Sequence, residues 1–116
     1  IIDSMARLLP FTRSEAYGAS KAAVHYLTQS LSVDLRAKGV IVQSVSPGFV
    51  ETPLTDKNDF EMPMKITAEE AAETLLKRIE AKQMAIYFPN VFGWILRILN
   101  HLPQRIKRWL SSKLQQ

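Results

Sequence analysis

The sequence of 116 residues contains no cysteine. Disulfide scaffolds, zinc sites with cysteine ligands and thiol nucleophiles are therefore excluded. The absence of cysteine is also consistent with a reducing compartment, so we expect a cytoplasmic location. The two histidines, His25 and His101, stand alone without the spacing of metal ligands. We therefore expect no metal site, and we expect His25 to be a surface side chain.

Glycine and long apolar runs are scarce as well. The four glycines are Gly18, Gly39, Gly48 and Gly93, and none belongs to a glycine-rich turn between a strand and a helix. Such turns cradle the phosphates of nucleotides, so we expect no phosphate cradle in this chain. No uninterrupted apolar run approaches the roughly 20 residues that cross a bilayer.

The composition is that of a folded domain. Apolar residues make up 47% of the chain and charged residues 22%, a balance typical of globular proteins rather than disordered ones. A chain of 116 residues has the size of one small domain. The opening Ile1-Ile2 resembles the last part of a buried strand, so we expect a C-terminal piece of a longer protein.

Hydrophobic periodicity and turn signals predict alternating strands and helices. The expected elements are a strand end at 1–2, a helix over about 14–37, a strand over 40–45, an irregular loop over 49–66, a helix over 67–82, a strand over 84–88, and two short helices over 91–100 and 103–114. This order is typical of an α/β fold with a parallel sheet. Three strands cannot cover both edges of such a sheet, so the pattern requires more strands than this chain contains.

Several helix ends carry specific signals. Ser14 and Gly39 are a typical helix start and stop. Thr67 and Glu70 match a capping box, and Pro103 is suited to the first position of the last helix. Along the long helix, apolar side chains at helical spacing predict one broad buried face: Ala23, Val24, Tyr26, Leu27, Leu31 and Leu35.

The most informative residues are Tyr17 and Lys21, four positions apart near the start of the long helix. Side chains at this spacing project from the same helix face, about 6 Å apart along the axis. The lysine ammonium favours the phenolate form of the tyrosine, which can then exchange a proton with a carbonyl or alcohol oxygen. Such a pair also arises by chance, and taken alone it favours a structural role.

Two further segments follow predicted strand ends, where α/β sheets place their ligands. Ser4 lies thirteen residues before Tyr17, and its hydroxyl could hydrogen-bond the same substrate oxygen. The segment 47–53 contains Gly48, which would let the backbone approach a ligand, and Thr52, which adds a hydroxyl. Each has an ordinary alternative, because loop serines and Pro-Gly pairs are common turn formers.

Together these segments resemble the short-chain dehydrogenase/reductase family. The matching residues are Ser4-Met5-Ala6, Tyr17-Gly18-Ala19-Ser20-Lys21-Ala22-Ala23 and Val45-Ser46-Pro47-Gly48-Phe49-Val50-Glu51-Thr52-Pro53. Their order and spacing are those of the family's second half, closely over residues 1–55 and loosely over the whole chain. The resemblance implies the C-terminal part of a doubly wound, Rossmann-like parallel sheet, followed by a basic amphipathic helical tail.

The resemblance also implies an NAD(P)-dependent oxidoreductase, which transfers a hydride between nicotinamide and a small carbonyl or secondary alcohol substrate. Tyr17 would be the general acid/base. Lys21 would hold the nicotinamide ribose and favour the phenolate form of Tyr17, and Ser4 would polarise the substrate carbonyl. The cofactor-binding residues would be Tyr17, Lys21, Pro47, Gly48, Val50 and Thr52. Residues 54–66 would form the variable substrate loop, and the helix 14–38 would lie in a homo-oligomer interface.

Two departures from the family pattern matter. Arg7 stands where the family usually has a small residue, often glycine, which would alter the pocket wall without removing a catalytic group. The first half of the family's domain is absent, with its phosphate cradle, its catalytic asparagine and the residue that selects NAD or NADP. We therefore expect the activity to belong to a longer parent protein, with NAD or NADP as cofactor, and this chain alone to be inactive.

Positive charge is concentrated in the last part of the chain, which we call the tail (residues 91–116). Residues 1–90 carry ten basic and eleven acidic side chains, whereas the tail carries five basic and no acidic ones. The basic side chains of the tail are Arg97, Arg105, Lys107, Arg108 and Lys113. Two tryptophans and apolar residues at helical spacing accompany them, which is the composition of a helix lying in a membrane interface.

The tail leaves two interpretations open. It is either a helix pair that packs on the protein's own core or a partner subunit, or a peripheral contact with a membrane. The second gives an alternative function, a catalytically inactive module that binds a membrane surface or a partner. We expect the catalytic half over 1–90 and the tail over 91–116 as separate units. Nucleic acid is not an expected partner, because the positive charge is confined to the tail.

Overall fold

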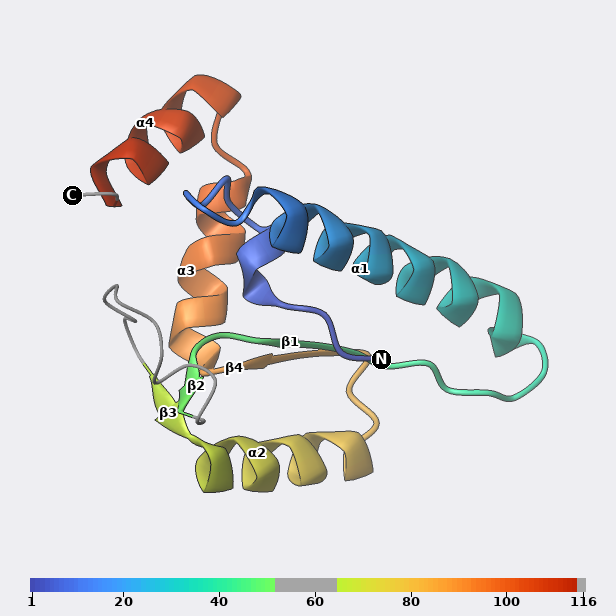
Figure 1. The fold of residues 1–116 in the computed structure, drawn as a ribbon. Helices are drawn as coiled ribbons and strands as arrows, with labels where there is room; N and C mark the ends of the chain where they lie inside the picture. Colours follow the sequence, from blue (N-terminus) through green and yellow to red (C-terminus); the bar gives the residue numbers. More distant parts are fainter. Residues whose placement is uncertain (52–64, 115–116) are drawn as a thin grey trace.

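The computed structural model describes residues 1–51 and 65–114. Helices and short strands alternate along the chain (Figure 1). The helices are η1 (Met5–Arg7, a 3-10 helix), α1 (Glu15–Arg36), α2 (Ala68–Glu80), α3 (Asn90–Asn100) and α4 (Gln104–Leu114). The strands are β1 (Ser44–Pro47), β2 (Val50–Glu51), β3 (Ile66–Thr67) and β4 (Ala85–Phe88). The predicted order of the main elements is confirmed.

Parallel pairing joins segments that are far apart in the sequence. β1 and β4 run parallel, with Val45 opposite Ile86. On the other side of β1, Val45 forms a parallel bridge with Ile2. The Asp3 amide supports this bridge with a 2.7 Å hydrogen bond to the Val45 carbonyl. Three parallel segments, in the order Ile2, β1 and β4, confirm the predicted α/β fold.

β1 starts later than the sequence predicts. Val40 and Ile41 lie outside the strand and are exposed. The paired stretch begins at Ser44, opposite Ala85, which is the first residue of β4. β-branched side chains favour a strand locally, but a strand forms only where a neighbouring segment accepts its hydrogen bonds.

A second parallel pair is a feature that the sequence does not predict. In it, β2 and β3 pair with Val50 opposite Ile66, and the Ile66 amide donates to the Phe49 carbonyl at 3.0 Å. The loop predicted over 49–66 is therefore held together at its two ends. Strands of two residues are too short to show a detectable alternation of side chains.

Helices cover both faces of the sheet formed by β1 and β4 (Figure 1). Val45, Ile86 and Phe88 face α2 and form an apolar cluster with it. A second apolar cluster joins η1, β4 and α3: Met5, Leu8, Leu9, Tyr87, Phe92 and Leu96. Because successive side chains of a strand point to opposite faces, Ser44 and Ser46 lie on the face beneath α1. That face of β1 is therefore polar.

α1 has the predicted ends, but the prediction of one broad buried face is wrong for the described residues. Ser14 occupies the N-cap position, and Gly39 has a left-handed φ of 74° just beyond the helix. Thr28 is buried, whereas Tyr26 and Leu27 are 73% and 53% exposed. Periodicity identifies an apolar face, but not the element that would cover it.

The N-cap half of the capping box predicted at the start of α2 is confirmed. The Thr67 hydroxyl accepts a hydrogen bond from the Glu70 amide at 3.1 Å and donates to the Glu70 carboxylate at 3.0 Å. α2 ends at Glu80, two residues before the predicted end. Lys82 has a left-handed φ of 58°, which cannot continue a right-handed helix.

α3 and α4 match the two helices predicted for the tail, each displaced by one residue at its start. α3 packs against β4 and buries Phe92 and Leu96. Pro103 precedes α4, and its carbonyl accepts the Ile106 amide at 2.9 Å. α4 lies beyond the end of α3, away from the sheet (Figure 1). In the part of the chain that the structure describes, the helices are too short or too polar to cross a membrane.

We expect Gly93→Ala to destabilise the protein, because α3 approaches β4 too closely for a side chain here. A Cβ atom at residue 93 would lie 2.7 Å from the Tyr87 Cβ and 3.2 Å from the Met5 Cε. Overpacking of this kind costs about 1–3 kcal/mol. Gly18→Ala is the control, because its Cβ would meet the Ala6 carbonyl oxygen at 3.4 Å, an ordinary contact. Urea unfolding measures both variants, and an unchanged midpoint for Gly93→Ala would contradict the close packing.

Candidate active site

Tyr17 and Lys21 lie side by side in the first turns of α1. The Lys21 ammonium nitrogen is 5.7 Å from the centre of the Tyr17 ring, as expected for positions one helical turn apart. Tyr17 is 51% exposed, so its phenol is accessible to a ligand. The two side chains therefore share one accessible surface of the helix.

Ser4 caps the short helix η1, which the sequence does not predict. Its hydroxyl oxygen accepts a hydrogen bond from the Ala6 amide at 3.1 Å, and the residue is only 9% exposed. A hydroxyl that accepts one hydrogen bond still has its own proton to donate. Ser4 can therefore stabilise the local backbone and also donate to a ligand atom.

η1 lies between the other two segments that the sequence singles out. On one side it packs against the start of α1, where Gly18 faces the Ala6 carbonyl. On the other side, the Met5 sulfur is 3.5 Å from the place that a Cβ would take at Gly48. The structure therefore brings the serine, tyrosine and Pro-Gly segments into one region (Figure 1).

The predicted nicotinamide-binding residues lie at the C-terminal end of β1. Pro47 is the last residue of β1, and Val50 is the first residue of β2. The Gly48 amide donates to the Phe88 carbonyl at 2.9 Å. A Cβ at Gly48 would lie 3.0 Å from the Phe92 ring, so the packing of α3 gives a structural reason for glycine here.

The structure describes only part of the predicted site. Thr52 and most of the predicted substrate loop, residues 54–64 of 54–66, lie outside the described residues. At the far end of that loop, Ile66 is half-buried beside α2. The described part of the site therefore consists of η1, the start of α1 and the turn after β1.

A buried polar cluster lies directly before Ser4. Asp3 is only 2% exposed. Its carboxylate is contacted by His25 Nδ1 at 2.9 Å and by Arg7 Nε at 3.4 Å. The Ser46 hydroxyl donates to the same carboxylate. A carboxylate buried to this degree requires such partners, because an unpaired buried charge is very costly.

Arg7 extends this cluster to β4. Its guanidinium donates to the Tyr87 hydroxyl at 3.0 Å and to Ser46 Oγ at 3.2 Å. The Arg7 side chain is 9% exposed and is directed at the sheet. The residues that share these contacts, which we call the Asp3 cluster, are Asp3, Arg7, His25, Ser46 and Tyr87.

His25 corrects a prediction. It was expected on the surface, but its side chain is 16% exposed and contacts Asp3. A carboxylate only accepts hydrogen bonds, so Nδ1 carries the proton in this contact. A lone histidine in a sequence gives no sign of a distant partner. The spacing of Asp3 and Arg7, four residues apart, is the local signal that could have revealed part of the cluster.

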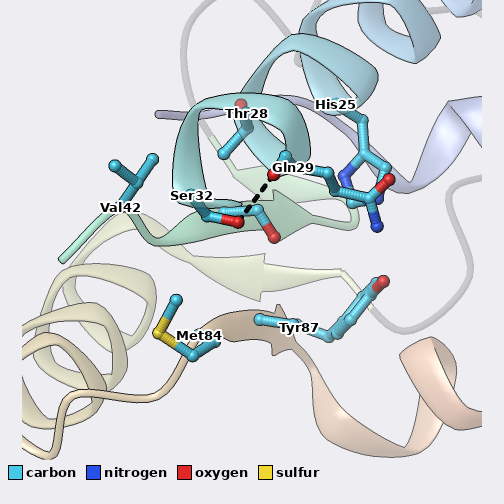
Figure 2. Close-up of a pocket in the computed structure, with 9 residues that line it drawn as sticks. His25, Thr28, Gln29, Ser32, Val42, Met84 and Tyr87 are labelled. Carbon is cyan, nitrogen blue, oxygen red and sulfur yellow. Dashed lines mark hydrogen bonds between the residues drawn. The ribbon is translucent and has the colours of Figure 1, made fainter. Parts of the chain in front are cut away.

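A cavity of about 200 Å³ lies beside the cluster, between α1 and the sheet (Figure 2). His25 and Tyr87 line one end, and Val42 and Met84 line the other. Among the described residues, its lining includes none of the three predicted catalytic side chains. The cavity is therefore separate from the surface that Tyr17 presents.

The arrangement around η1 can support proton transfer at an oxygen atom. A phenol beside an ammonium can donate or accept a proton, and a serine hydroxyl can hydrogen-bond an oxygen atom of a ligand. Tyr17 and Lys21 are accessible, while Ser4 is anchored by its cap.

Comparison with known proteins identifies a family for this chain. The family model for short chain dehydrogenases matches residues 1–63. An uncharacterized oxidoreductase of Myxococcus xanthus is 34% identical over 113 residues, which is 97% of this chain. The 17-beta-hydroxysteroid dehydrogenase type 3 of Mus musculus is 36% identical over 107 residues, which is 90% of this chain.

A solved structure has the same fold. A short-chain dehydrogenase from Sphingobium yanoikuyae, in complex with NADPH, matches with a TM-score of 0.69 and 22% identity over 89% of this chain. This likeness confirms the predicted fold class. The chain spans 42% of the Myxococcus relative, 33% of the mouse relative and 44% of the Sphingobium chain.

We expect Asp3 and Arg7 to stabilise the fold cooperatively. Arg7→Met keeps the length of the side chain but removes donors from the buried carboxylate, which should cost about 1–3 kcal/mol. Asp3→Asn leaves the guanidinium without its carboxylate and should cost a similar amount. The double variant should lose less than the sum, with a coupling energy of about 1–3 kcal/mol. Chemical denaturation of the four proteins measures this cycle, and additive losses would rule out the cooperation.

Proposed function

The chain belongs to the short-chain dehydrogenase/reductase family, and we propose that it forms the C-terminal catalytic half of an NAD(P)-dependent oxidoreductase. The enzyme transfers a hydride between nicotinamide and a small carbonyl or secondary alcohol substrate. The observation that carries this proposal is the accessible pair of Tyr17 and Lys21, 5.7 Å from ring centre to ammonium, beside η1. The relatives support it, since their names are those of an oxidoreductase and a dehydrogenase.

Tyr17 exchanges a proton with the substrate oxygen. In the reducing direction its phenol donates the proton while the carbonyl carbon receives the hydride, and in the oxidising direction its phenolate takes the proton back. Lys21 lies one turn further along α1 and stabilises the phenolate by its positive charge. Ser4 donates a hydrogen bond to the same oxygen and holds it within reach of Tyr17.

The donors on this chain fit one end of a nicotinamide cofactor, which supplies the hydride. The Lys21 ammonium and Tyr17 hydroxyl suit the ribose hydroxyls. The further proposed contacts of the nicotinamide are Pro47, Gly48, Val50 and Thr52. The chain has no glycine-rich turn, so its residues fit the nicotinamide end of the cofactor and not the diphosphate end. NAD and NADP are identical at their nicotinamide ends, so these residues fit either cofactor. The similar Sphingobium structure is a complex with NADPH.

The exposed face of α1 supports a homo-oligomer. Tyr26, Leu27 and Val33 are 73%, 53% and 74% exposed, and they lie on one broad side of the helix. Contiguous apolar side chains of this size typically mark an interaction surface. A second copy of the same helix, packed across this face, covers them on both subunits at once.

We expect Tyr17→Phe in the complete enzyme to lower kcat by about 10²- to 10⁴-fold, because the variant has no proton to transfer. Cofactor binding should weaken far less than kcat falls, because the variant loses one proposed hydrogen bond to the ribose while Lys21 remains. The measurement is NADH and NADPH oxidation with a panel of aliphatic and aromatic ketones.

Tyr26→Phe is the matched control, because it removes the same hydroxyl from an exposed position nine residues further along α1. Its turnover should equal that of the wild type. Normal turnover of Tyr17→Phe would end the proposed mechanism.

A second property, contact with an anionic membrane surface, is favoured by the exposed side of α3. This helix has two apolar faces. One buries Phe92 and Leu96 against the core. The other exposes Trp94, Ile95 and Ile98, at 61%, 44% and 60%. A helix that had only to pack on its own domain would need the first face alone.

α4 also exposes apolar side chains. Ile106 and Trp109 are 42% and 58% exposed, and they line a surface hollow of about 560 Å³ with Pro103 and Arg105. The tail has five basic and no acidic side chains. Exposed tryptophans beside basic side chains are typical of interfacial helices, and the charge complements anionic headgroups. The resulting proposal is a cytoplasmic enzyme whose tail rests on a membrane surface; the alternative for the tail is a partner subunit.

We expect the protein to bind vesicles that contain phosphatidylserine more tightly than vesicles of phosphatidylcholine alone. Replacing Arg105, Lys107 and Arg108 together with Gln should weaken binding by about 100-fold, since each basic side chain near the surface contributes about 1 kcal/mol. The same replacement of Arg36, Lys38 and Lys82, which are exposed cations outside the tail, should have little effect. Flotation at two salt concentrations measures both, and equal binding to the two vesicle types would exclude this contact.

A further inference from the structure

We propose that the Asp3 cluster positions the Ser4 hydroxyl relative to the Tyr17 phenol. The cluster residues that do so are Asp3, Arg7 and His25, which act as positioning residues through their neighbours and do not touch the reacting atoms. This inference rests on the proposed function, because it concerns the same active site.

The backbone ties this part of the chain to the sheet only at its start. The Asp3 amide donates to the Val45 carbonyl at 2.7 Å. The next residues form η1, which is closed by internal hydrogen bonds such as that from the Arg7 amide to the Ser4 carbonyl at 3.3 Å. Internal bonds determine the shape of a short helix but not its orientation on the sheet. Side chains must therefore set the orientation of η1. Met5 packs in the apolar cluster with Tyr87 and Phe92, and the directional contacts come from Asp3 and Arg7.

The Asp3 carboxylate connects η1 to the layers on both sides. One oxygen accepts the Ser46 hydroxyl from β1, and the other faces His25 Nδ1 in α1 at 2.9 Å. His25 lies one helical turn beyond Lys21, on the same face of α1. A slide or rotation of α1 would break this contact. The position of the tyrosine helix is therefore linked to the residue that precedes Ser4.

Arg7 secures the other end of η1. Its guanidinium reaches Tyr87 on β4 at 3.0 Å and Ser46 on β1 at 3.2 Å, and its side chain is 9% exposed. Asp3 stands two residues before η1, next to its N-cap Ser4, and Arg7 is the last residue of η1. Polar contacts to the sheet therefore flank the short helix on both sides. Ser4 lies between these two attachments.

This attachment matters because two groups must meet one substrate oxygen at the same time. Each must come within about 2.6–3.2 Å of that atom. A misplacement of about 1 Å can lower a rate about 100-fold. A disturbed Asp3 cluster should therefore lower turnover, while cofactor affinity, which depends on other contacts, is retained.

The experiment compares two variants of His25 in the complete enzyme. His25→Leu removes the donor to Asp3, whereas His25→Asn keeps an amide N–H close to the position of Nδ1. We expect His25→Leu to lower kcat by about 10- to 100-fold, with the KM for the nicotinamide cofactor changed less than about twofold. His25→Asn should restore most of kcat. Asp3→Asn keeps the side-chain volume, and it should show the same loss of kcat at nearly constant KM.

Thr28→Val is the matched control on the next turn of α1. Thr28 is buried, but its hydroxyl donates within its own helix, to the Val24 carbonyl at 2.8 Å. The control should keep wild-type kcat. Normal kcat in His25→Leu, or a loss that His25→Asn does not restore, would overturn the positioning role if Tyr17→Phe is inactive. Normal turnover of Tyr17→Phe would instead overturn the proposed function itself.

Discussion

The buried carboxylate of Asp3 is the constraint around which this structure is arranged. It lies at the end of the first parallel segment, where water cannot solvate it, so donors must come from every neighbouring layer. His25 supplies one from α1, Ser46 one from β1 and Arg7 one from η1. These elements cannot shift independently without leaving a charge unpaired in the interior. On this side of the sheet, polar contacts therefore act together with the apolar cluster around Met5 and Tyr87.

The two faces of the sheet have different roles as a result. The face beneath α2 is apolar, with Ile86 fully buried, and it contributes stability through the burial of hydrophobic surface. The face beneath α1 carries Ser44 and Ser46, which offer hydrogen bonds rather than apolar packing. Hydrogen bonds are directional, so they hold neighbouring elements in a defined orientation. This is the face on which the proposed catalytic helix lies.

Local signals predicted the parts of the structure that depend on local geometry. The pair of Tyr17 and Lys21 follows from the pitch of a helix, and the Thr67 capping box follows from the unsatisfied amides of a helix start. The late start of β1 and the exposed face of α1 did not follow, because each depends on which segments lie alongside. His25 is the sharpest example, since nothing near it in the sequence indicates a carboxylate 22 residues away.

The amino-acid sequence by itself determined the order of the main helices and strands, the spacing of Tyr17 and Lys21, and the concentration of positive charge in the tail. These properties depend on neighbours within a few residues, where bond geometry fixes distance and direction. Only the tertiary structure decided that Arg7 turns toward the sheet and that Gly48 is packed against Phe92. Such contacts join residues 39 to 80 positions apart. Their formation depends on the balance of burial and hydrogen bonding over the whole fold, which no short stretch of sequence contains.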